Sequence, residues 1–164
     1  ASYHAIKDNP SYHPGRCAAV VIDGTEVGVI GQVHPLVAKN YGIDVDVYCA
    51  EISFTKLLSC RLPDATYAPL PKYPSVTRDL ALICDEAVTV AQAEDVITAA
   101  AGKLLRDVKL FDIYRGVGVP DGKKSMAFSL ELRADDRTLT DTDSEGVVTK
   151  VLNSLSQKLN ATLR

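Results

Sequence analysis

The chain has 164 residues and a mass of 17.7 kDa, enough for one ordinary domain or two small ones with a buried core. Apolar residues make up 46% and charged residues 24%, which excludes a disordered or fibrous protein. The net charge of −3 argues against binding nucleic acid by bulk charge alone. No apolar run approaches the roughly 20 residues that cross a bilayer, and the first residues lack a secretion signal. We therefore expect a cytoplasmic protein with no membrane partner.

Cysteines and histidines are scattered along the chain: Cys17, Cys49, Cys60, Cys84, His4, His13 and His34. The cysteines form no C-x-x-C pair, and this spacing favours reduced, mostly buried thiols over a disulfide framework. Zinc is the alternative, although the scatter differs from the spacing of usual zinc ligands. We predict no metal site. His13 and His34 each precede a proline, which suits a turn better than a catalytic role.

The sequence of residues 1–70 predicts a small segment that contains both strands and a helix. Its expected elements are strands over Cys17–Ile22 and Thr25–Ile30, a helix from Pro35 to Gly42, and a strand over Asp46–Phe54. The Asp-Gly dipeptide between the first two strands is typical of a tight hairpin turn. Residues 1–16 show no period, and we expect them to be irregular. Three strands and one helix make a thin core, so we interpret this part as the truncated end of a larger α+β domain.

A proline-rich stretch follows that segment. Leu62–Pro74 holds four of the eight prolines of the chain and has neither a helical nor a strand period. Prolines at this density favour an extended linker. We therefore place the domain boundary near residue 70 and expect domains over 1–70 and 71–164.

The second domain shows a complete pattern of alternating elements. We expect strands over Arg78–Cys84, Val108–Arg115, Ser125–Arg133 and Ala161–Arg164, and helices that begin after Thr89 and Thr140. Each helix start has the spacing of a capping box, with Gln92 and Asp143 as the third residues. The order βαββαβ predicts a ferredoxin-like α+β sandwich, in which both helices cover one face of an antiparallel sheet.

Alternation along the strands predicts what the other sheet face carries. Met126, Phe128, Leu130 and Leu132 alternate with Ala127, Ser129, Glu131 and Arg133, so the second set faces away from the helices. On the neighbouring strand we assign Phe111 and Ile113 to the core. Leu110, Asp112 and Tyr114 then point outward.

An outward aromatic beside a carboxylate and small residues leaves room for a flat ligand. A base can stack on Tyr114 while Asp112 accepts a hydrogen bond from it. The alternative is that Tyr114 only shields the sheet edge. The glycine-rich loop before Ser125 lacks the spacing of a phosphate-binding Walker loop. Lys123 and Lys124 either contact backbone phosphates or keep this loop solvated. No nucleophile constellation is present, so we expect no catalytic residues.

Several segments together resemble a known family. Residues 71–164 resemble the ferredoxin-fold anticodon-binding domain that ends the β subunit of bacterial phenylalanyl-tRNA synthetase. The matching pieces are YPSVTRDLAL (73–82), LFDIYRG (110–116), PDGKKSMAFSLEL (120–132), DRTLTD (136–141) and ATLR (161–164). Upstream, HPGRCA (13–18), GTEVGVIGQVHP (24–35) and VYCAEI (47–52) resemble the end of that subunit's non-catalytic, class II synthetase-like module.

The resemblance implies a non-catalytic fragment that binds the anticodon of tRNA-Phe. It implies a parent ligase of two α and two β chains, which uses ATP and Mg²⁺ at an active site on the α subunit. The tyrosine of the FD-x-Y motif, here Tyr114, would stack on an anticodon base. The expected tRNA-binding residues are Tyr114, Asp112, Arg78, Ala127, Ser129, Lys123, Lys124 and Ser125. The alternative is a ferredoxin-like module that binds a metabolite or another protein without RNA.

Overall fold

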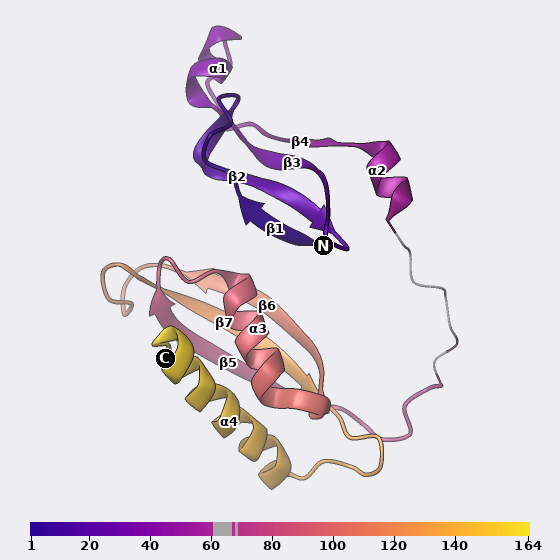
Figure 1. The fold of residues 1–164 in the computed structure, drawn as a ribbon. Helices are drawn as coiled ribbons and strands as arrows, with labels where there is room; N and C mark the ends of the chain where they lie inside the picture. The colour runs from indigo at the N-terminus through magenta and orange to yellow at the C-terminus, as the bar shows by residue number, and fades with distance from the viewer. Residues whose placement is uncertain (61–66, 68) are drawn as a thin grey trace. The chain divides into compact units, whose positions relative to one another are not determined.

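The computed structural model describes residues 1–60, 67 and 69–164. The linker expected over Leu62–Pro74 lies partly outside the described residues. The chain forms two compact units, Ala1–Tyr67 and Ala68–Arg164 (Figure 1). In the described part, no helix is both long enough and apolar enough to cross a membrane.

The first unit is a four-stranded antiparallel sheet with two short helices. Its strands, in the spatial order β1-β2-β3-β4, are β1 (Ser2–Ala5), β2 (Tyr12–Ile22), β3 (Thr25–Val33) and β4 (Tyr48–Ile52). The helices are α1 (Pro35–Asn40) and α2 (Phe54–Ser59). The hairpin prediction is confirmed, because Asp23 and Gly24 join β2 to β3 with φ values of 48° and 75°.

Two expectations for this unit are wrong. Residues 1–16 are not irregular, because they contain β1 and the start of β2. These strands lack periodicity since β1 is an exposed edge strand, and Pro14 falls in an irregular stretch of the β2–β3 pairing, where a proline is tolerated. The strand expected over Asp46–Phe54 is shorter, because Ser53 caps α2 by accepting a hydrogen bond from the Lys56 amide.

The second unit is the predicted ferredoxin-like sandwich. Its elements are β5 (Val76–Asp85), α3 (Val90–Ala101), a single 3₁₀ turn (Gly102–Leu104), β6 (Leu105–Tyr114), β7 (Lys123–Leu132), α4 (Asp141–Leu159) and β8 (Thr162–Leu163). The antiparallel sheet has the order β6-β7-β5-β8, and both helices lie on one side of it (Figure 1). We call the opposite side of this sheet the open face. The prediction of an α+β ferredoxin-like fold is confirmed.

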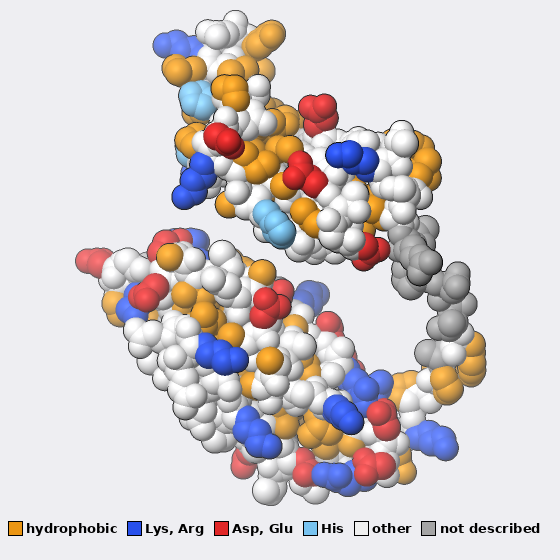
Figure 2. All heavy atoms as spheres, viewed as in Figure 1, with side chains coloured by type: hydrophobic (Ala, Val, Ile, Leu, Met, Phe, Trp, Pro, Cys, Tyr) orange, Lys and Arg blue, Asp and Glu red, His pale blue; other side chains and the backbone are white. Residues whose placement is uncertain are grey.

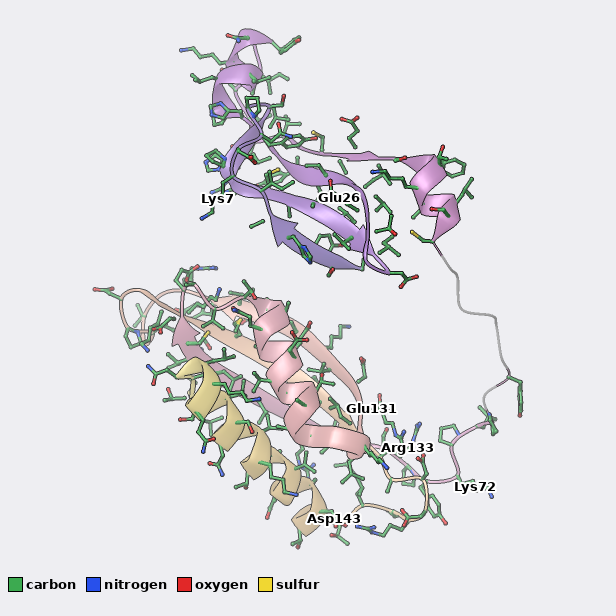
Figure 3. The ribbon with its side chains drawn as sticks, viewed as in Figure 1. Lys7, Glu26, Lys72, Glu131, Arg133 and Asp143 are labelled. Carbon is green, nitrogen blue, oxygen red and sulfur yellow. The ribbon has the colours of Figure 1, made fainter. Side chains whose placement is uncertain are left out.

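Both capping boxes form as the sequence predicts. The Thr89 hydroxyl accepts from the Gln92 amide, and the Gln92 side chain accepts from the Thr89 amide. Thr140 and Asp143 make the same exchange at the first turn of α4, where Figure 3 labels Asp143. These bonds satisfy amides that the first turn of a helix leaves without partners.

The capping of α4 predicts a specific pH dependence. Hydrogen bonds from the Thr140 backbone and hydroxyl, and then from Arg137, lower the pKa of Asp143. A lowered folded pKa stabilises the protein above the unfolded carboxyl pKa, and this contribution is lost as pH falls through the folded value. We expect Asp143→Asn to flatten the acid side of a plot of melting temperature against pH. Thr140→Ser keeps the acceptor and should follow the wild-type curve; an unchanged slope for Asp143→Asn would contradict the assignment.

The core lies between the sheet and the two helices. Its buried strand residues are Leu80, Leu82, Cys84, Met126, Phe128, Leu130 and Leu132, and its helix residues include Ala93, Ile97, Val147, Val151 and Leu155. The predicted inward set on β7 is therefore confirmed.

The assignment of Phe111 to the core is wrong. Leu110 lies opposite Phe128 and Asp112 lies opposite Ala127, so β6 holds one extra residue at this point. This β-bulge reverses the alternation, because two residues of one strand oppose a single residue of the other. Leu110 consequently packs against the core, whereas Phe111 is 56% exposed. Ile113 lies opposite Met126 on the helix side but remains 37% exposed.

Candidate nucleic-acid interface

The strand register places two rows of side chains across one end of the open face. One row is Tyr114, Ser125, Ile83 and Thr162, and the next is Asp112, Ala127, Ala81 and Arg164. Directly opposed residues of antiparallel strands share a face, so each row runs over all four strands. The second row has two alanines between a carboxylate and a guanidinium, which leaves a shallow floor between charged ends.

Tyr114 is held at one corner of this region. Its side chain is on the open face as predicted, and the residue is 37% exposed. The Tyr114 hydroxyl donates to the carbonyl oxygen of Val117 at 3.4 Å. A Cβ at Gly116, where φ is 152°, would stand 2.8 Å from the Tyr114 oxygen, so this position requires glycine. The loop therefore holds the Tyr114 ring at its hydroxyl end.

The small residues expected in the site also lie on the open face. Asp112 is exposed and lies opposite Ala127, and Ser129 follows in the next row opposite Lys109 and Asp79. Ser125 lies between Tyr114 and Ile83 but is only 3% exposed, so other side chains cover it. The structure thus brings Tyr114, Asp112, Ala127 and Ser125 together.

The two lysines before Ser125 have different surroundings. Lys123 pairs with Asp85 across the strands, at 3.1 Å between Nζ and Oδ1. Lys124 is buried, and its Nζ donates to the carbonyl oxygen of Glu86 at 2.9 Å. Lys124 also lies opposite Cys84, which is a core residue, so it is not beside Tyr114. Of the two, Lys123 alone remains within reach of a ligand on the open face.

The β6–β7 loop forms a surface pocket of about 390 Å³ whose charges are balanced. Arg115 donates to the Glu86 carboxylate from Nε at 3.0 Å and also from Nη2. The Arg115 hydrogen bond lowers the pKa of Glu86. With Lys123 paired to Asp85 as well, this loop offers little uncompensated positive charge to a phosphate.

Arg78 lies away from the expected site. It is opposite Leu130 on the helix side of the sheet. Its Nη2 donates to Asp141 at 2.8 Å and to the Ser144 hydroxyl at 2.9 Å, which ties β5 to the first turn of α4. The structure therefore gives Arg78 a role in attaching α4 and does not bring it together with Tyr114.

Sequence reasoning missed three residues of this region. Ala81 and Ile83 lie on the open face, and the alternation of β5 with the buried Leu80 and Leu82 was the signal that could have found them. Arg164 was also missed: its guanidinium carbon lies 5.1 Å from the centre of the Tyr114 ring. No local pattern indicates that contact, because it joins the two outer strands of the sheet.

Other candidate groups have structural partners. The four cysteines are free thiols, of which Cys17 and Cys84 are buried and Cys49 is exposed. The His34 ring accepts from the Leu36 amide at the start of α1, and the His13 ring accepts from the Gly15 amide. Within residues 1–60, 67 and 69–164, no three side chains of the metal-binding types form a group.

Charges on the helix side are mixed. Lysine and arginine side chains lie among aspartate and glutamate side chains on the face seen in Figure 2. On the open face, Asp107 lies opposite Glu131, and Figure 3 shows Glu131 and Arg133 near the end of β7 that is remote from the loop after Tyr114. The opposed carboxylates of Asp107 and Glu131 disfavour a phosphate backbone at that position of the sheet.

Comparison with known proteins identifies relatives for both units. Residues 71–164 match the family model described as the ferredoxin-fold anticodon binding domain, and residues 1–54 match the model described as the phenylalanyl tRNA synthetase beta chain CLM domain. The chain is 40% identical over 164 residues to a phenylalanine–tRNA ligase beta subunit of Clostridium tetani, covering 100% of this chain and 21% of that protein.

A second relative is the phenylalanine–tRNA ligase beta subunit of Bacillus licheniformis, which is 44% identical over 160 residues, or 98% of this chain and 20% of that protein. The chain thus spans about a fifth of the length of the curated relatives it matches. Because one family model covers more than half of the chain, the chain belongs to the ferredoxin-fold anticodon-binding domain family, as part of a phenylalanyl-tRNA synthetase β chain.

Proposed function

We propose that this chain is a non-catalytic tRNA-binding fragment that recognises the anticodon of tRNA-Phe on the open face of its second unit. The observation that carries the proposal is Tyr114, which shares the open face with the Asp112 carboxylate and the small residue Ala127 and whose hydroxyl is held by the Val117 carbonyl. An aromatic ring stacks a base, and a carboxylate accepts hydrogen bonds from its edge. Ala127, Ser125 and Ser129 would line the same site.

The charge distribution supports base reading over backbone binding. Lys123 is paired, Lys109 shares a row of the open face with Asp79, and the carboxylates of Asp107 and Glu131 lie opposite each other in the row beyond. A phosphate chain would be repelled there, whereas an unstacked neutral base would not. This fits a domain that reads one or two splayed bases while other parts of a larger enzyme hold the tRNA backbone.

For the full-length protein we propose the assembly implied by its family. The parent would be a ligase with two α and two β chains, with ATP, Mg²⁺ and the active site on the α subunit, in the cytoplasm. These properties belong to the whole enzyme and not to this fragment.

A binding titration tests the proposed function. We expect fluorescence or electrophoretic titration to show tighter binding of tRNA-Phe than of a non-cognate tRNA. Equal affinity for the two RNAs would contradict the proposed specificity for tRNA-Phe. Failure to bind either RNA would favour the alternative, a module for a metabolite or protein, for which the surface pocket between Gln92 on α3 and Lys158 on α4 is the first place to look.

The fragment should have no aminoacylation or ATP–pyrophosphate exchange activity. The sequence offers no nucleophile constellation, and the proposed site only binds. Activity that survives removal of host synthetase from a highly purified sample would contradict this expectation.

Lys123 should contribute only through general electrostatics. Because Lys123 is already paired with Asp85, we expect Lys123→Ala to weaken cognate and non-cognate RNA by the same small factor. The slope of log affinity against log salt should fall by about one or less. Lys150→Ala, on α4, is the matched control and should change neither quantity. A loss confined to the cognate tRNA would show that Lys123 reads sequence.

A further inference from the structure

The chain's own Arg164 lies where a stacked base is proposed to lie. The guanidinium carbon of Arg164 is 5.1 Å from the centre of the Tyr114 ring, which is the geometry of a cation–π contact. The guanidinium also approaches the β6–β7 loop, because a Cβ at Gly118 would stand 3.9 Å from Nη2 of Arg164.

The route of this side chain follows from the order of the strands. The Arg164 amide donates to the Ala81 carbonyl at 2.9 Å, which fixes its backbone beside β5. Tyr114 is on β6, and β7 lies between the two strands. The arginine side chain therefore extends from beside β5 toward β6, where its guanidinium meets the Tyr114 ring and the loop at Gly118.

The low exposure of Ser125 agrees with an Arg164 side chain that lies over this part of the sheet. Ser125 is on the open face between Tyr114 and Ile83, yet only 3% of it is exposed. An arginine side chain that reaches Tyr114 from β8 passes over this part of the sheet. The face of the Tyr114 ring on which a base is proposed to stack is thus the face that Arg164 already covers.

We propose that Arg164 is a positioning residue that covers Tyr114 in the free protein and is displaced when an RNA base stacks on the ring. This inference rests on the proposed function. An exposed cation–π contact is weaker than base–aromatic stacking, so the base can take the place of the guanidinium. Until then the contact restrains the Tyr114 ring, and the released guanidinium can approach a phosphate of the same RNA.

Arginine side-chain resonances test this proposal directly. In the whole chain labelled with ¹³C,¹⁵N-arginine, the Arg164 δ-CH₂ signals are those lost in Arg164→Met. We expect them upfield in the free protein, because the guanidinium carbon two bonds away lies over the Tyr114 ring, and moved to ordinary positions in Tyr114→Leu. Saturation of the wild type with the anticodon stem-loop of tRNA-Phe should move them to the Tyr114→Leu positions. Arg115→Met removes the neighbouring, Glu86-paired arginine and should leave these signals in place.

Each other outcome overturns a defined part of the proposal. Arg164 signals that are not upfield in the free protein would contradict the proposal that Arg164 covers the Tyr114 ring. Signals that stay upfield at saturation, while other open-face resonances shift, would overturn the displacement and leave the proposed function standing. If the stem-loop shifts no resonance at all, the proposed function fails and the displacement fails with it.

Discussion

Tyr114→Ala should weaken binding of the tRNA-Phe anticodon stem-loop by about tenfold or more. Stacking of a base on an aromatic side chain contributes roughly 1–3 kcal/mol, and about 1.4 kcal/mol corresponds to a factor of ten. The substitution should barely change the melting temperature, because Tyr114 is on the open face and leaves no core cavity. A binding titration together with a melting curve measures both quantities.

Tyr114→Phe is the matched control for that experiment. It keeps the ring and removes only the hydroxyl that donates to the Val117 carbonyl, so it should retain most of the affinity. If Tyr114→Ala unfolds the domain, the assignment of Tyr114 to the open face is wrong. If the variant folds normally and binds as tightly as wild type, the stacking role is wrong.

Phe128→Ala should have the largest effect on stability. Phe128 is fully buried at the centre of β7, between Leu80 on β5 and Leu110 on β6. Truncation of a buried phenylalanine leaves a cavity and costs about 3–5 kcal/mol of unfolding free energy. Urea unfolding followed by circular dichroism measures that loss.

Phe111→Ala makes the same chemical change only one strand away and is the control. Phe111 is the extra residue of the bulge and is 56% exposed, so its removal should change the unfolding free energy by no more than about 0.5 kcal/mol. Comparable losses from the two variants would mean that Phe111 is part of the core and that the bulge is misplaced.

The features predicted well from sequence are those determined by neighbours along the chain. The capping pairs at Thr89 and Thr140 and the turn at Asp23 form through contacts within three residues, so their spacing carries the information. The alternation of β7 was also sufficient, because every second residue from Met126 to Leu132 is apolar and buried.

The features that sequence reasoning missed depend on contacts between strands. A period of two residues cannot show where a strand gains an extra residue, so Phe111 was assigned to the core. The sequence did indicate the position of Arg78. This residue alternates in phase with the buried Leu80 and Leu82, so it faces the helices and not the open face. The contact between Arg164 and Tyr114 crosses the whole sheet, and no spacing along the chain encodes it.

The bulge in β6 also determines which kinds of mutation this surface can tolerate. Upstream of Phe111 the even-numbered Leu110 faces the helices, and downstream the even-numbered Asp112 and Tyr114 face away from them. Deleting Phe111 would restore a regular strand and keep Asp112 and Tyr114 opposite Ala127 and Ser125 on the open face, because the extra residue is the one removed. Deleting Ile113, after the bulge, would instead place Tyr114 opposite Met126 on the helix side. Substitutions can adjust this surface gradually during evolution, whereas a one-codon deletion between the bulge and Tyr114 would turn that side chain to the other face in a single step. Among homologous genes, the number of residues between Asp112 and Tyr114 should therefore vary less than the presence of the extra residue at Phe111.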